Sequence, residues 1–225
     1  MSYASLLLFL LRTRYAISLT KKTTIMKKVL LLSAATVIAL CCMAFSNVSA
    51  TDKPVKGKHV EISFDYIKKQ GPGSNQYAVW IENDRGEVVK TLFVTSFTTK
   101  GRVREGQPIK RGYTYRPACV PTWVTNAKAA DMTDAELDAF TGATPKESGK
   151  QTFVWDFTDS EGKRVSKGSY KVCVEATLKN EYKLLYVGTL SPKDKAGAIE
   201  LRETVTGYDE AYAGMIKDVK AIICK

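Results

Sequence analysis

A hairpin signal occupies residues 77–98, whose sequence is YAVWIENDRGEVVKTLFVTSFT. The runs Tyr77–Glu82 and Val88–Thr98 are rich in β-branched and aromatic residues, which favour strands. Between them lies the turn Asn83–Gly86, whose glycine can adopt the positive φ that tight turns often require. This stretch predicts two strands joined by a turn and places the chain among β-rich folds.

Further strand signals flank the hairpin on both sides. Apolar residues alternate with polar ones from Val60 to Tyr66, the period-2 pattern of a strand with one buried face. Later strands are predicted at residues 152–157, 169–178, 182–190 and 199–205. Short strands at this spacing favour an all-β fold, a β-sandwich. The pattern leaves residues 208–225 undecided between helix and strand.

The stretch Trp155–Tyr170 resembles the immunoglobulin-like module of flagellar hook-capping proteins and secretion-associated sandwich domains. It holds a tryptophan, turn glycines at Gly162 and Gly168, and a tyrosine that opens the next strand. The resemblance implies an immunoglobulin-like β-sandwich. It bears on fold and not on function.

The strand pattern is interrupted between residues 99 and 151. One helix is predicted there, because Thr133 followed by Glu136 forms a capping box. Gly142 is placed to end that helix in a left-handed conformation. The expected architecture is a mainly all-β domain at residues 51–225, with one short helix in a long loop insertion.

Residues 1–50 have the three parts of a secretory signal peptide. Basic residues follow Met26, the apolar run Val29–Ala44 comes next, and small residues end at Ala50, where cleavage is predicted. The apolar run is shorter than the about 20 residues that span a bilayer. We therefore expect an exported protein that starts at Met26, is periplasmic or otherwise extracytoplasmic, and has no transmembrane segment after cleavage.

A lipid anchor on Cys41 or Cys42 is the less favoured alternative, because the residue before a modified cysteine should be small and here is Leu40 or Cys41. Export would leave three cysteines, Cys119, Cys173 and Cys224. At most one internal disulfide can form among three, and their spacing does not choose the pair.

The charge balance argues against nucleic-acid binding. Six of the 34 Lys and Arg lie before residue 51, which leaves 28 against 23 acids and a net charge of +5. These charges are scattered, whereas nucleic-acid binding needs a clustered basic stripe. The single histidine, His59, also excludes His-rich metal sites and His-dependent triads.

The run DAFTGAT at residues 138–144 resembles the flavin-attachment site of FMN-binding domains in membrane redox pumps. In that motif an Asp is followed, after two variable residues, by Ser or Thr, Gly, Ala and Thr. A transferase esterifies the last Thr with FMN. The resemblance assigns FMN attachment to Thr144, with Asp138, Thr141, Gly142 and Ala143 as motif residues. Thr141 stands where Ser is common.

The residue types suit that chemistry. Pro145 disfavours helical backbone at Thr144, so the acceptor hydroxyl is expected to be presented by extended chain. Asp138 lies in the last helical turn, where a negative charge opposes the helix dipole, so we expect a role in recognition by the transferase or a metal. Nearness in sequence suggests Trp123, Tyr113, Tyr115 and Phe140 as ring neighbours and Arg116, Lys128 and Lys146 as phosphate partners.

Six spaced motifs together resemble a family of predicted periplasmic proteins classed as a domain of unknown function. They are residues 75–82, residues 90–92, Arg116-Pro117, residues 121–124, the Thr-Gly-Ala-Thr-Pro run and Trp155-Asp156. The resemblance covers nearly all of residues 51–225. The family name supplies no activity, but the acceptor run implies a substrate of the FAD:protein FMN transferase.

The sequence leaves two hypotheses for the function, which belong to different classes of protein. The first is an exported electron-transfer protein that carries covalent FMN on Thr144, receives it from the FAD:protein FMN transferase, and exchanges electrons with membrane or periplasmic redox proteins. The second is a cofactor-free, immunoglobulin-like binding or structural module, in which residues 138–144 are an inert helix end and loop. A hydrolase is a weaker third interpretation, because the sequence shows no nucleophile with a base.

Overall fold

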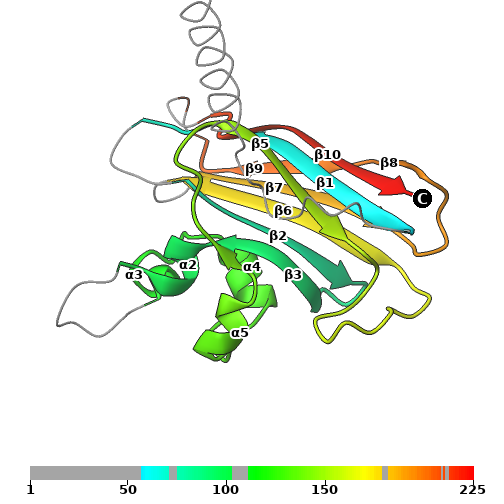
Figure 1. The fold of residues 1–225 in the computed structure, drawn as a ribbon. Helices are drawn as coiled ribbons and strands as arrows, with labels where there is room; N and C mark the ends of the chain where they lie inside the picture. The colour runs from blue at the N-terminus through cyan, green and yellow to red at the C-terminus, as the bar shows by residue number, and fades with distance from the viewer. Residues whose placement is uncertain (1–56, 71–74, 103–110, 179–181, 209, 211–212) are drawn as a thin grey trace, which may run out of the picture. The chain divides into compact units, whose positions relative to one another are not determined.

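The computed structural model describes residues 57–70, 75–102, 111–178, 182–208, 210 and 213–225. The predicted signal peptide and lipidation cysteines lie outside the described residues. Within the described part, two β-sheets face each other and short helices cover one of them (Figure 1). None of the helices in this part is long and apolar enough to cross a membrane.

The smaller sheet has four strands in the order β5-β1-β10-β8, and the larger has six in the order β4-β3-β2-β6-β7-β9. The strands of the smaller sheet are β1 His59–Tyr66, β5 Gly149–Trp155, β8 Gly197–Ile199 and β10 Ile216–Cys224. Those of the larger are β2 Gln76–Asn83, β3 Val88–Thr95, β4 Thr141–Gly142, β6 Tyr170–Leu178, β7 Tyr182–Leu190 and β9 Arg202–Thr206. Every pairing between these strands is antiparallel except that of β3 with β4.

The predicted hairpin is confirmed as β2 and β3. The Asn83 side-chain oxygen accepts hydrogen bonds from the backbone N–H groups of Arg85 (2.9 Å) and Glu87 (3.0 Å), and Gly86 has a φ of 80°. The second strand ends at Thr95, three residues earlier than predicted. Residues Ser96–Lys100 form helix α2 instead, and the Thr95 and Thr98 hydroxyls both donate to the buried Gln76 side chain.

The core between the sheets follows the alternation seen in the sequence. Val60, Ile62, Phe64 and Tyr66 of β1 are all buried, as the period-2 pattern predicts. They pack against inward-facing residues of the larger sheet, which include Tyr77, Val79, Ile81, Val172, Val174 and Ala176. The prediction of a mainly β architecture with two sheets is therefore confirmed.

The outer face of the larger sheet is also buried over its central strands β2 and β6, whereas the edge strand β9 is exposed. Ala78, Trp80 and Cys173 point away from the first core and pack against Trp123 and other residues of the helical layer. Since both of its faces are covered, β2 is almost wholly buried along its length, which explains its nearly unbroken apolar sequence. Figure 1 shows α4 and α5 on the side of this sheet that faces away from β1 and β5.

The prediction of a single helix in the insertion at about 99–151 is wrong. Among the described residues of this region lie α3 Gly112–Tyr115, α4 Pro121–Asn126 and α5 Asp134–Asp138, and α2 ends within it. Strand β5 begins at Gly149, three residues before the predicted strand. Only α5 has the predicted capping box. Helices α3 and α4 are four and six residues long and have no side-chain cap, and the one local signal at their starts is Pro121 in the first turn of α4.

The predicted strand at 199–205 is really two strands in different sheets, β8 and β9, separated by residues 200–201. A sequence alternation cannot reveal that the chain changes sheets. The undecided segment 208–225 contains β10, which pairs with β1 from His59 to Tyr66. Its partner strand, rather than its own propensity, explains the extended conformation.

Helix α4 is anchored by a residue from a distant strand. The Glu175 side chain of β6 is fully buried, and its two oxygens accept hydrogen bonds from the backbone N–H groups of Thr122 (3.1 Å) and Trp123 (3.0 Å). The preceding Val120 adopts a left-handed conformation with a φ of 41°, which costs energy in a β-branched residue. Glu175 therefore satisfies helix-start donors that would otherwise be buried and unpaired.

Glu175→Gln is expected to reduce the pH dependence of stability. Burial raises the pKa of Glu175 above its ordinary value, although the hydrogen bonds from Thr122 and Trp123 oppose the shift. The folded protein thus holds a proton at pH values where the unfolded chain has lost it, so the free energy of unfolding falls as the pH rises above the unfolded pKa. The slope approaches about 1.4 kcal/mol per pH unit at most.

Urea unfolding measured from about pH 4 to pH 8 checks this slope, since an unfolded Glu has its pKa near the lower limit. Glu161→Gln is the matched control, because that side chain is 69% exposed and pairs only with the neighbouring Lys163. Identical pH profiles for the wild type and Glu175→Gln would contradict the assignment.

Candidate functional site

The predicted acceptor segment, residues 138–144 and called the acceptor segment below, runs from the end of α5 into the short strand β4. The Phe140 carbonyl oxygen accepts a hydrogen bond from the Val94 N–H (3.1 Å), and Thr141 and Gly142 pair in parallel with Val94 and Thr95 of β3. The segment thus joins the edge of the larger sheet. The chain then crosses to the smaller sheet, where β5 starts at Gly149.

The prediction that Gly142 ends the helix in a left-handed conformation is wrong. Helix α5 ends at Asp138, and Gly142 is extended within β4. A Cβ atom at this position would lie only 2.1 Å from Cε2 of Phe93. Glycine is needed there because the backbone passes directly against an aromatic ring, and not because of its φ.

Asp138 has a structural partner that the sequence did not indicate. Its carboxylate lies 2.9 Å from the Lys100 ammonium at the end of α2, with both side chains about half exposed. Surface ion pairs of this kind contribute about 0–1 kcal/mol. The pair offsets the unfavourable position of the carboxylate at a helix C-terminus and leaves it open to solvent.

The two threonines of the segment differ in environment. The Thr141 hydroxyl donates to the Leu137 carbonyl oxygen (2.6 Å) and lies 2.9 Å from the Thr99 hydroxyl. Thr144 is partly exposed and follows the exposed Ala143. No hydrogen bond joins its hydroxyl to another residue in the described part of the chain. The two hydroxyls therefore differ in their hydrogen bonds within the described residues: that of Thr141 is engaged and that of Thr144 is not.

The aromatic residues predicted as ring neighbours lie in different settings. Trp123 is fully buried, its indole N–H donates to the Thr91 hydroxyl (3.0 Å), and its ring meets Phe140 edge-on at 5.8 Å. It is a core residue of the helical layer. Tyr115 is 52% exposed, and the Tyr113 hydroxyl lies 3.2 Å from the Ala129 carbonyl oxygen, to which it donates.

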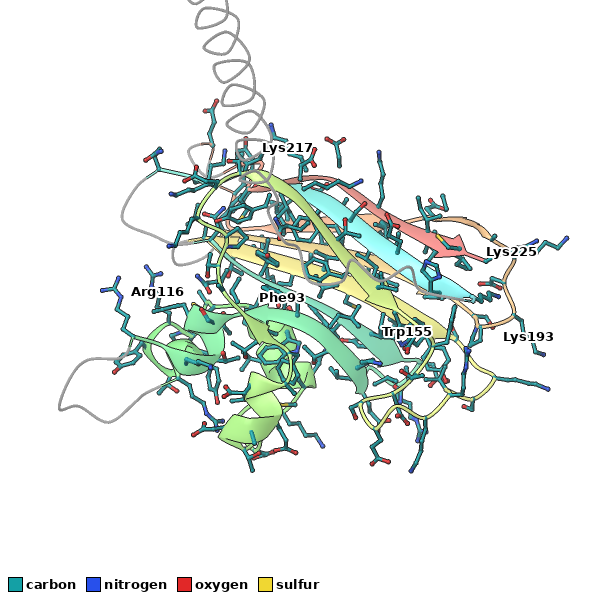
Figure 2. The ribbon with its side chains drawn as sticks, viewed as in Figure 1. Phe93, Arg116, Trp155, Lys193, Lys217 and Lys225 are labelled. Carbon is teal, nitrogen blue, oxygen red and sulfur yellow. The ribbon has the colours of Figure 1, made fainter. Side chains whose placement is uncertain are left out.

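The three residues predicted as phosphate partners share no contact in the described structure. The Arg116 guanidinium lies over the Phe97 ring, 5.7 Å from its centre, and Figure 2 shows Arg116 outside the two sheets, beside α3. Lys128 and Lys146 are exposed. The structure instead brings Lys100 to the acceptor segment, a residue that the sequence did not single out because it lies 38 positions before Asp138.

Phe93 and Arg111 are further residues that the sequence did not identify. The Phe93 ring lies directly against the backbone of Gly142. The Arg111 guanidinium donates to the Ala129 carbonyl oxygen (2.8 Å) and lies 3.4 Å from the Asp134 carboxylate, so it ties α5 to the chain before it. Both residues contact partners that are distant in the sequence, and the motif at residues 138–144 contains no information about such contacts.

The three cysteines of the described chain, Cys119, Cys173 and Cys224, are free thiols. Burial raises the pKa of Cys119 to about 11 and raises that of Cys173 further. Both buried thiols therefore stay protonated at neutral pH and have little nucleophilic character.

The sequence model of a family described as "Predicted periplasmic protein (DUF2271)" matches residues 57–202. The chain belongs to this family. The match includes the acceptor segment and most of both sheets, and it confirms the family predicted from the spaced motifs. No curated protein matches the chain, and no solved structure matches it either. The family description gives a predicted periplasmic location and no activity.

Gly142→Ala is expected to destabilise the protein by about 1–3 kcal/mol, because the new methyl group overlaps the Phe93 ring. Adding Phe93→Leu, which removes the atoms that clash, should make the combined cost less than the sum of the two. Denaturant unfolding in a double-mutant cycle measures this coupling. Gly149→Ala is the control, since nothing lies within 4 Å of its added methyl group. Equal effects of the two alanine variants would contradict the packing role.

Proposed function

We propose that this protein is an extracytoplasmic flavoprotein that carries FMN esterified to Thr144 and exchanges electrons with membrane or periplasmic redox proteins. The observation that carries the proposal is the contrast between its two motif threonines. Thr141 is held by hydrogen bonds within the fold, whereas Thr144 is partly exposed and its hydroxyl makes no hydrogen bond to another described residue. An acceptor must present such a hydroxyl to a second protein.

The proposed attachment is a phosphoryl transfer from FAD. The Thr144 hydroxyl oxygen forms a bond to the phosphorus of the FMN half, the anhydride bond between the two phosphates breaks, and AMP leaves. The hydroxyl proton passes to a base of the FAD:protein FMN transferase or to solvent. No electrons are exchanged, so the step needs only FAD and the transferase.

The residues around Thr144 suit this step. Ala143 is small and exposed, and Pro145 favours extended backbone at Thr144, so little bulk surrounds the hydroxyl. The pairing of Thr141 and Gly142 with β3 fixes the chain immediately before the acceptor. The transferase would therefore meet a short exposed loop on a rigid base.

When attached, FMN supplies the redox chemistry, and the protein sets its surroundings. Asp138 keeps an exposed carboxylate near the loop through its pair with Lys100. That carboxylate is suited to recognition by the transferase or by a metal that the transferase holds. The described chain would thus act as a carrier whose fold positions the acceptor.

The alternative is a cofactor-free, immunoglobulin-like periplasmic module. The ion pair of Asp138 and the packing of Gly142 on Phe93 favour it, because they give two motif residues structural roles that need no flavin. They do not account for the partial exposure of Thr144. The two hypotheses predict different masses for the exported protein, because only the first adds FMN to it.

Thr144→Ala is expected to abolish modification by an active FAD:protein FMN transferase. The wild type, exported into a periplasm that contains the transferase, should gain the mass of one FMN less one water. Thr144→Ser keeps a hydroxyl and should retain the adduct, and Thr125→Ala, which removes an exposed threonine on α4, should leave the adduct unchanged. Intact mass spectrometry measures all four proteins. An unmodified wild type beside a modified known acceptor would refute the proposal.

Asp138→Asn is expected to reduce modification at least tenfold while changing the stability by less than about 1 kcal/mol, the usual limit for a surface ion pair. Lys100→Ala is the matched variant, because it breaks the same ion pair and keeps the carboxylate. If Asp138 serves recognition, only Asp138→Asn loses the adduct. If the ion pair matters only for structure, both variants behave alike in mass spectrometry and in urea unfolding.

A further inference from the structure

Two phenylalanines from different sheets meet near the acceptor segment. Phe93 of β3 and Phe153 of β5 have ring centres 5.3 Å apart, and both side chains are only partly buried. Figure 2 shows Phe93 between the two sheets. We call this pair the aromatic platform. It lies where an edge strand of the smaller sheet approaches β3 of the larger one.

Buried rings hold the aromatic platform in place. Phe93 stacks on Tyr77 at 5.0 Å with an interplanar angle of 17°, and Phe153 stacks on Phe64 at 5.9 Å and 29°. The Tyr77 hydroxyl donates to the Gln151 side-chain oxygen (3.2 Å). The two rings are thus fixed from behind, while part of each remains accessible.

The acceptor segment passes this platform two residues before Thr144. A Cβ at Gly142 would point at the edge of the Phe93 ring. Strand β4 ends at Gly142, and Pro145 favours extended backbone at Thr144. Chain that continues extended places the side chain of residue 144 on the same face as that of residue 142, about 7 Å further on. The chain then enters β5, the strand that holds Phe153.

We propose that the flavin ring of FMN on Thr144 packs against Phe93 and Phe153. This inference rests on the proposed attachment at Thr144 and names the residues that receive the ring. An aromatic ring gains stacking and apolar burial on such a surface. The geometry disfavours Trp123, because its ring is fully buried and its indole N–H is already bonded to Thr91. Tyr115, which is half exposed on α3, is the competing surface.

Flavin fluorescence of the full-length, flavinylated protein tests the platform. Intact mass first establishes that each variant carries FMN, so failure of attachment is seen separately from failure of docking. Phe153→Leu should shift the docked-to-free ratio of the ring about fivefold, the loss expected for one aromatic pair, and so lower the fluorescence anisotropy of the flavin. Phe153→Tyr keeps a ring and should keep the anisotropy of the wild type. Phe93→Leu should behave like Phe153→Leu.

Tyr115→Leu separates the two surfaces. A fall in anisotropy in Tyr115→Leu, with none in Phe153→Leu, would overturn the platform, and so would no fall in any variant. A second measurement does not depend on variants: iodide should quench the flavin of the native wild type about fivefold less than that of the urea-unfolded protein. Equal quenching in the two states would also overturn the inference.

Discussion

The structure depends on covering both faces of the larger sheet at its central strands β2 and β6, and the buried Glu175 side chain is central to the outer cover. Strand β6 presents Cys173, Glu175 and Thr177 on that face, where a sheet beside water would place exposed polar groups. Glu175 binds the first N–H groups of α4, and Thr177 accepts a hydrogen bond from the Val120 N–H (3.2 Å). These bonds position a helix too short to be stable alone and place Trp123 over the sheet.

From this anchor the contacts lead to the acceptor segment. Trp123 in α4 meets Phe140, whose carbonyl oxygen binds β3, and the next two residues pair with the same strand. Gly142 then passes against Phe93, which is partly buried and packs against the inner core. The segment is therefore fixed from the helical layer on one side and from the core between the sheets on the other. Only the residues after Gly142 leave the sheet edge, and Thr144 is among them.

Much of the fold could be predicted, because alternation in β1 and the turn at Asn83–Gly86 are local signals. The sequence pattern gave no correct prediction where the conformation of a segment is set by contacts with residues elsewhere in the chain. Residues 199–205 divide between two sheets, and residues 216–224 are extended because they pair with β1 and β8. The candidate site shows the same division. Residues 138–144 and the capping box of α5 were visible in the sequence, whereas Lys100 and Phe93 were not, since each meets the segment through tertiary contact.

The sequence by itself determined the mainly β class, the hairpin, the family and the presence of an acceptor-like run. Those features depend on residue type and short-range spacing, which folding does not alter. The tertiary structure alone decided that Gly142 serves close packing rather than helix termination, that Trp123 is buried, and that the Thr141 hydroxyl is held by hydrogen bonds within the fold. Such distinctions arise from which distant side chains pack against each residue, and local residue type and spacing do not specify those partners.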